Sequence, residues 1–174
     1  MMESAKPKKE GVGERLDRRL VAVMFTDMVG YTALMQADER IGIDRRDRYW
    51  AALERHHEVF GGTIVQRLGD GRMSMFASSL DAVLAGVAIQ GELAAQEVPV
   101  RIGIHVGEVI VEPEQLTGDA VNIAARIESF AVPGGVMLSD TGSGAHSRQS
   151  YGCSTGSFSR SDCECRTTAN GWPC

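Results

Sequence analysis

The chain has 174 residues, a length that suits one domain with its own hydrophobic core. Its formal net charge of -5 argues against a general nucleic-acid-binding protein, because such proteins are usually basic. Residues 1–18 are polar, locally basic and without the apolar stretch of a signal peptide, so we expect a flexible leader. The longest strongly apolar run, residues 20–25, is too short to span a membrane, and we expect a cytoplasmic protein with no membrane segment.

The first part of the chain predicts a strand followed by two helices. Residues 20–25 form a short apolar run rich in strand formers, which is typical of a buried central strand. A tight turn at Gly30 and a short helix through Leu34 and Met35 follow it. The next helix is amphipathic, because the residues of one stripe recur at spacings of three and four: Trp50, Leu53, His57 and Phe60. We expect His57 to pack on this stripe and not to act in catalysis.

A hairpin and a second long helix come next. Gly61 and Gly62 should end the first long helix, and residues 63–76 then predict a strand, a D-G turn and a second strand. Residues 79–95 predict a helix whose buried face is Ala82, Val83, Ile89 and Leu93. The remaining predicted elements are a strand at 98–111 bent near Gly103 or Gly107, a loop at 112–117, a helix at 121–130 and a short strand at 136–138.

This order of elements predicts the fold class, an α/β (α+β) ferredoxin-like sandwich in which helices pack against one sheet. After Leu138 the composition changes, because residues 140–174 contain no Ile, Leu, Val or Met. We expect a disordered or non-native tail, and the abrupt change favours a frameshift over an ordinary polar tail. The later strands of the sheet would then be missing, and the edge at residues 136–138 would lack a partner. All four cysteines lie in this tail, and their spacing predicts neither a zinc site nor a disulfide framework.

Two aspartates are the candidate metal ligands. Asp27 follows the first strand, and Asp70 lies at the tip of the hairpin. Adjacent strands can bring both carboxylates to one edge, where hard cations such as Mg²⁺ bind oxygen ligands and assist phosphoryl chemistry. Either aspartate alone is more often a turn or cap residue, so the functional interpretation depends on the pair.

Two further segments carry groups that suit a phosphate and a sugar. Residues 28–32 would start a helix, where backbone amides and the helix dipole attract phosphate and Gly30 allows close approach. Asn122 and Arg126 are four residues apart, which places both on one face of a helix. An Asn can orient a sugar, and an Arg can stabilise charge on a phosphate. A capping Asn and a solvated Arg are nevertheless the commoner explanation of this spacing.

Four motifs in this order resemble the catalytic domains of class III adenylate and guanylate cyclases. They are F-T-D-M-V-G-Y-T, G-G-T-I-V-Q-R-L-G-D-G, R-I-G-I-H-V-G-E-V and T-G-D-A-V-N-I-A-A-R-I-E, followed by P-G-G. The resemblance covers residues 19–139, which we interpret as the catalytic domain. It implies an enzyme that converts ATP or GTP to the 3′,5′-cyclic nucleotide and pyrophosphate in second-messenger signalling.

The resemblance also implies a role for each candidate residue. Asp27, Asp70 and the backbone carbonyl of Met28 would hold two Mg²⁺ or Mn²⁺ ions per site. Asn122 would orient the ribose, and Arg126 would stabilise the transition state. The substrate would also meet Val29, Gly30, Tyr31, Thr32, Gln66 and Gln115. Because the family works as dimers with shared active sites, one chain of a homodimer would supply both aspartates and the other Asn122 and Arg126.

The sequence departs from the family pattern in the base pocket and in the tail. Gln66 stands where adenylate cyclases typically carry Lys, and Gln115 stands where they usually carry Asp or Thr. A Gln amide can meet either adenine or guanine, so the base preference stays open. Residues 140–174 contain no Lys to contact the triphosphate. We therefore predict weak or absent activity for this chain.

Three other interpretations compete with an active cyclase. A catalytically impaired, cyclase-like regulatory or dimerisation module fits the altered base pocket and the tail, whereas the intact aspartates, Asn122 and Arg126 favour activity. A diguanylate cyclase of related topology is disfavoured, because the chain lacks a G-G-[DE]-E-F run. An RNA-binding sandwich would need exposed aromatic residues and a basic face, and this chain is acidic.

Overall fold

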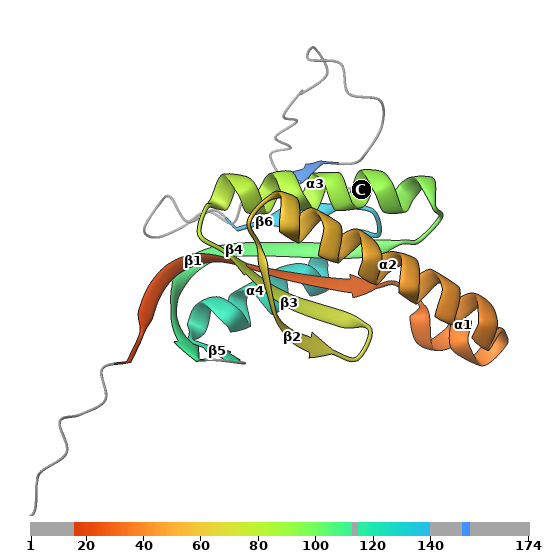
Figure 1. Cartoon of the computed structure of the whole chain (residues 1–174), viewed down its shortest axis with the longest axis horizontal. Helices are drawn as coiled ribbons and strands as arrows, with labels where there is room; N and C mark the ends of the chain where they lie inside the picture. Colours follow the sequence, from red (N-terminus) through yellow and green to blue (C-terminus); the bar gives the residue numbers. More distant parts are fainter. Residues whose placement is uncertain (1–15, 113–114, 140–150, 154–174) are drawn as a thin grey trace, which may run out of the picture.

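The computed structural model describes residues 16–112, 115–139 and 151–153, which form one sheet with helices packed against it (Figure 1). The elements in chain order are β1 (Arg18–Met28), α1 (Tyr31–Ala37), α2 (Glu39–Val59), β2 (Thr63–Leu68), β3 (Gly71–Phe76), α3 (Ser79–Ala95), β4 (Val100–Glu112), β5 (Gln115–Thr117), α4 (Asp119–Phe130), β6 (Val136–Leu138) and β7 (Tyr151–Cys153). No helix in these ranges is both long enough and apolar enough to cross a membrane.

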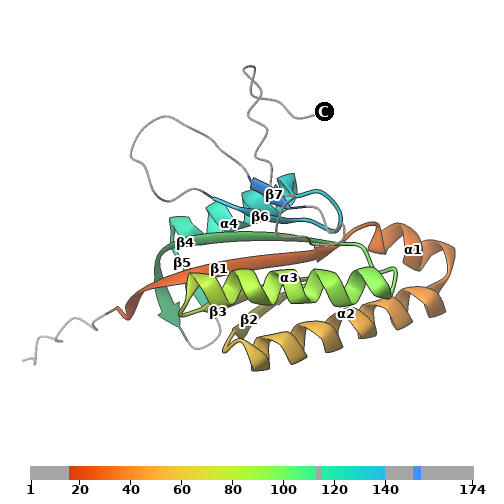
Figure 2. The same cartoon turned by 90° about the horizontal axis from the view of Figure 1, so that it is seen from above.

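The sheet has the strand order β2-β3-β1-β4-β6-β7, and β5 pairs with β4 beside this path. β1 lies in the middle, antiparallel to both β3 and β4, while β4 and β6 are parallel. α2 and α3 cover one face, and α4 covers the other (Figure 2). The predicted α/β sandwich is therefore confirmed, with the addition that helices lie on both faces of the sheet.

Two hydrophobic cores lie on opposite faces of the sheet, because successive side chains of a strand alternate between its faces. Ala22 and Met24 of β1 enter the core under α2 and α3, whereas Val21 and Val23 enter the core under α4. Odd-numbered residues at the end of β1 therefore face α4. Asp27 belongs to this second set, so its side chain starts on the α4 face.

The buried face of α2 is rotated from the predicted stripe. Tyr49 is completely buried, and its hydroxyl lies 2.6 Å from the hydroxyl of Thr26 in β1. Tyr49 therefore takes the buried position predicted for Trp50, because this hydrogen bond satisfies its hydroxyl in the core. Trp50 itself is only partly buried. His57 is buried as expected, and its Nδ1 donates to the carbonyl oxygen of Leu53 at 2.7 Å.

The structure corrects two predictions about strands. Part of the predicted loop at 112–117 is the strand β5, which pairs antiparallel with the end of β4. The edge at residues 136–138 does not lack a partner either, because β7 pairs antiparallel with β6. An edge strand presents unpaired N–H and C=O groups that favour such pairing, whatever the composition of the added segment. The rest of the predicted tail lies outside the described residues.

Two glycines of β4 allow α4 to lie directly on the sheet. A Cβ added at Gly103 would come within 2.2 Å of the backbone nitrogen of Glu128, and one added at Gly107 within 2.7 Å of the Cβ of Ala120. The predicted long strand is confirmed, since β4 runs unbroken through both glycines. Their role is to leave room for the helix.

Gly103→Ala should therefore lower the free energy of unfolding by about 1–3 kcal/mol, the usual cost of overpacking. Gly91→Ala is the matched control, because Gly91 is exposed on α3 with nothing within 4 Å of an added Cβ. That variant should gain up to about 1 kcal/mol from helix propensity. Urea unfolding followed by circular dichroism measures both changes. A Gly103→Ala variant as stable as the parent would contradict the close contact between α4 and β4.

Candidate functional site

Asp27 and Asp70 come together at one edge of the sheet. Asp27 is the last residue but one of β1, and Asp70 lies in the turn between β2 and β3. β1 pairs with β3 in a register that sets Thr26 opposite Arg72, so this turn lies beside the end of β1. A Cβ added at Gly71 would lie 3.7 Å from Oδ1 of Asp27. The glycine therefore leaves the space next to the Asp27 carboxylate free of a side chain.

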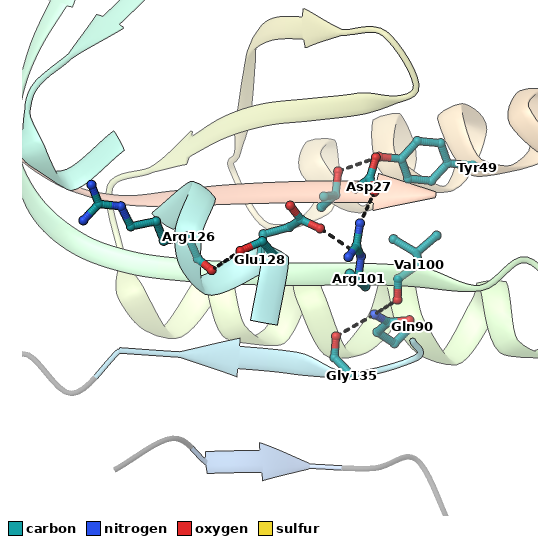
Figure 3. Close-up of polar contacts among 10 residues, drawn as sticks. Asp27, Tyr49, Gln90, Val100, Arg101, Arg126, Glu128 and Gly135 are labelled. Atoms are coloured by element: carbon teal, nitrogen blue, oxygen red, sulfur yellow. Dashed lines mark hydrogen bonds and ion pairs between the residues drawn. The ribbon is translucent and has the colours of Figure 1, made fainter. Parts of the chain in front are cut away.

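A cation from the next strand already contacts one of these carboxylates (Figure 3). Arg101 stands opposite Asp27 in the β1–β4 pairing, and its Nη2 donates to Oδ2 of Asp27 at 2.5 Å. Its Nε lies 3.1 Å from Oε1 of Glu128 on α4, an ion-pair distance without hydrogen-bond geometry. Burial raises the pKa of the Glu128 carboxyl, although Arg101 opposes the shift. Sequence reasoning missed Arg101 and Glu128.

The electrostatics at Asp70 suit a bound cation. Burial raises the pKa of the Asp70 carboxyl, and the negative charge of Asp27 raises it further, while Arg101 and Arg72 act in the opposite direction. No group of three or more His, Cys, Asp or Glu side chains forms a metal cluster within the described ranges. Two neighbouring carboxylates fit Mg²⁺ or Mn²⁺, since such ions commonly take one or two protein carboxylates and complete their shell with water and phosphate oxygens.

The segment that follows β1 offers fewer groups than predicted. The Met28 side chain is buried in the core, so only its backbone could reach a ligand. The amide of Val29 donates to the carbonyl oxygen of Pro99 at 2.9 Å and is therefore already engaged. Gly30 is exposed with a φ of 75°, a left-handed conformation that favours glycine, and α1 begins at Tyr31, followed by the exposed Thr32.

The other predicted residues lie on α4, β2 and β5. Asn122 and Arg126 are exposed on one face of α4, as their spacing predicts. Figure 3 shows the Arg126 side chain pointing away from Arg101 and Asp27. Gln66 lies on β2 and Gln115 on β5, and both are exposed. In the described ranges, no hydrogen bond or ion pair links any of these four side chains to the two carboxylates.

Two shallow clefts of about 360 Å³ each lie elsewhere on the molecule. One lies beside the start of α4, where Arg18, His105 and Asp119 are among its lining residues. The other lies between β2 and β5, with Ile64 and Leu116 among its lining residues. Neither of these two clefts includes Asp27 or Asp70, which are both partly buried at the edge of the sheet.

The sequence matches the family model of the adenylate and guanylate cyclase catalytic domain over residues 15–159. Putative adenylate cyclase 3 of Rhizobium meliloti (strain 1021) is 38% identical over 136 residues, which are 73% of this chain and 23% of that protein. The structure of an adenylate/guanylate cyclase/hydrolase from Silicibacter pomeroyi has a TM-score of 0.61 and 33% identity, and the match covers 71% of this chain and 76% of that one.

The adenylyl cyclase CyaB from P. aeruginosa has a TM-score of 0.66 at 24% identity, covering 72% of this chain and 79% of that one, and it bears on the fold alone. The chain spans only 23%, 16% and 28% of the length of the first three curated relatives. These relatives therefore contain much that has no counterpart in the matched region.

In a buffer with chelator, Asp70→Asn should stabilise the protein at about pH 7. Because the pKa of the Asp70 carboxyl is raised, the folded state binds a proton at this carboxyl more tightly than the unfolded state does. This tighter proton binding stabilises the folded state fully at pH values below the ordinary pKa of an aspartate. The contribution is lost as the pH rises through the raised pKa of Asp70 in the folded state. The gain from Asp70→Asn should therefore shrink as the pH falls towards about 4.

Thermal unfolding of parent and variant across this pH range tests the expectation. Glu58→Gln is the matched control, because it removes one negative charge from an exposed position of α2. If both variants gain equally at every pH, net charge and not the proximity of the two aspartates explains the result.

Proposed function

Because the chain belongs to the family of adenylate and guanylate cyclase catalytic domains, we propose that it converts ATP or GTP to the 3′,5′-cyclic nucleotide and pyrophosphate. The observation that supports this proposal is the position of Asp70, in the turn beside the end of β1, where the charge of Asp27 acts on its carboxyl. Signalling through the cyclic nucleotide would be the purpose of the reaction.

Asp27 and Asp70 would hold two Mg²⁺ or Mn²⁺ ions, with the backbone carbonyl of Met28 as a further ligand. When bound, the ions would supply positive charge to the triphosphate and to the attacking oxygen. Arg101 would keep Oδ2 of Asp27 oriented, since it already donates to that oxygen. Burial raises the pKa of the Asp70 carboxyl and the negative charge of Asp27 raises it further, and bound cations would offset both effects.

The reaction itself is an intramolecular displacement. The ribose 3′-oxygen forms a bond with the α-phosphorus, and its proton passes to solvent. The bond from the α-phosphorus to the bridging oxygen breaks, and pyrophosphate leaves with the electron pair. Asn122 would orient the ribose for this attack, and Arg126 would donate to the α-phosphate as its charge grows.

Asn122 and Arg126 would act on the substrate held by a second copy of the chain. Both are exposed, and no hydrogen bond or ion pair in the described ranges links their side chains to Asp27 or Asp70. A two-fold homodimer would set α4 of one chain over the carboxylate edge of the other and give two equivalent sites. Phosphate contacts from Gly30, Tyr31 and Thr32 would complete each site.

A regulatory or dimerisation module without turnover is the second candidate. The observation that favours it is the ion pair of Asp27 with Arg101, which occupies one carboxylate oxygen that a metal would also use. Gln66 and Gln115 at the base positions favour it as well. Residues 140–174 contain no Lys for the triphosphate, which implies a low rate if the chain does convert a nucleotide.

The shared site can be tested by mixing two inactive variants. Asp27→Ala and Arg126→Ala should each lower turnover at least about a hundredfold. An equal mixture should regain about a quarter of the parent activity, because half of the dimers are mixed and each has one intact site. Turnover is measured by chromatography of ATP or GTP with Mn²⁺.

The matched control is a mixture of Asp27→Ala with Asp70→Ala. Both changes lie in the same half-site, so neither site of a mixed dimer is intact and activity should stay absent. If the first mixture recovers nothing although mixed dimers form, the two-chain arrangement is wrong. If it recovers activity together with the control mixture, subunit complementation is not the cause.

The base preference of the parent should be weak. A rotatable Gln amide can pair with either base, so neither substrate leaves a buried group unpaired. We expect kcat/KM values for ATP and GTP within about tenfold of each other. The double variant Gln66→Lys, Gln115→Asp should favour ATP more strongly. A parent that already prefers one base by several orders of magnitude would contradict this assignment.

A further inference from the structure

Arg72 is a buried cation next to the turn that carries Asp70. It is 3% exposed, and it lies on the α2 face of the sheet, opposite Thr26 in the β1–β3 pairing. Its Nη1 donates to the carbonyl oxygen of Gly71 at 2.8 Å and to that of Gly69 at 3.1 Å. These two carbonyls flank Asp70 on either side, so one guanidinium nitrogen holds both ends of the turn.

An aromatic ring fixes the other side of this guanidinium. The Arg72 guanidinium carbon lies 4.4 Å from the centre of the Trp50 ring, and that of Arg46 also lies 4.4 Å from it. Such stacking favours a planar guanidinium and restricts its orientation. Arg72 is therefore held by the backbone of the turn and by the ring of α2.

This arrangement is hard to explain by stability. In the described part of the chain, Arg72 makes no ion pair, whereas Arg46 pairs with Asp47. Burial lowers the pKa of the Arg72 guanidinium, as expected for a charge removed from water. A buried charge without a carboxylate partner costs free energy, and apolar replacements of buried ionic groups are often neutral or stabilising. The hydrogen bonds that Arg72 donates to the turn explain its burial better than a contribution to stability does.

We propose that Arg72 is a positioning residue that fixes the β2–β3 turn so that the Asp70 carboxylate is presented beside Asp27 for a divalent cation. The binding of a cation by Asp70 rests on the proposed function. The order of the β2–β3 turn does not depend on that function. Arg72 acts through the carbonyls of Gly69 and Gly71 and has no role in the chemistry itself.

Replacement of Arg72 distinguishes a positioning role from the electrostatic effect of its charge. By Coulomb's law, Arg72→Met should tighten cation binding, because a nearby positive charge is lost. A positioning role predicts the opposite, about tenfold weaker Mn²⁺ binding by calorimetry, the usual effect of losing a residue that orients a ligand. The melting temperature should fall by no more than about 4 °C. Arg72→Lys keeps the charge but not the planar fork and should also weaken binding.

Arg46→Met is the matched control, because it removes the other stacked cation without touching the turn. It should leave Mn²⁺ affinity unchanged. Hydrogen exchange of peptides that span residues 66–72 gives a readout that needs neither metal nor turnover, and both Arg72 variants should exchange faster there and nowhere else. If Arg72→Met does not fold, Arg72→Lys decides by the same measurements.

Unchanged exchange of the turn in a folded Arg72 variant would overturn the proposal, as would unchanged or tighter Mn²⁺ binding. If the parent binds no Mn²⁺ at all, the proposed function fails, and the exchange of the turn alone decides whether Arg72 holds it.

Discussion

The antiparallel pairing of β1 with β3 is the constraint on which the candidate site depends. Its register sets Thr26 opposite Arg72, and this places the β2–β3 turn beside the end of β1. A slip of one residue would send every side chain of β3 to the other face of the sheet. Asp70 would then lose its position next to Asp27, and Arg72 would leave the α2 face and its contact with Trp50.

The two faces of the sheet contribute to the candidate site in different ways. The α2 face supports the carboxylate edge from behind, through the Tyr49–Thr26 hydrogen bond and the stack of Arg72 on Trp50. The other face receives α4 over Gly103, which allows a backbone contact that any side chain would prevent. This docking leaves Asn122 and Arg126 of α4 exposed.

Local patterns in the sequence predicted the elements well. The helix at residues 79–95 has the predicted bounds, and Gly61, with a φ of 66°, follows the end of α2 as expected. The D-G step marked the hairpin, and the motifs marked both aspartates. These features depend on nearest neighbours along the chain, where capping, turn chemistry and periodicity act directly.

Contacts between distant strands could not be predicted in the same way. The partner of Asp27 is Arg101, 74 residues away, and only the β1–β4 register brings them together. Arg72 and Tyr49 were missed because a polar group in a hydrophobic stripe is explained only once its hydrogen-bond partner is known. β5 and β7 are three residues each, and their pairing with a neighbouring strand, not their own composition, defines them as strands.

We propose that Asp27 and Asp70 bind divalent cations for cyclisation in a site that a second chain completes. The most direct measurement is the yield of products from ATP and from GTP with Mn²⁺ at increasing protein concentration, with the dimer fraction followed by light scattering. We expect cyclic nucleotide and pyrophosphate in equal amounts, at a low rate per chain that rises in parallel with the dimer fraction. A folded dimer that binds Mn²⁺ and converts neither nucleotide would contradict it, as would a rate per chain that is independent of dimer formation.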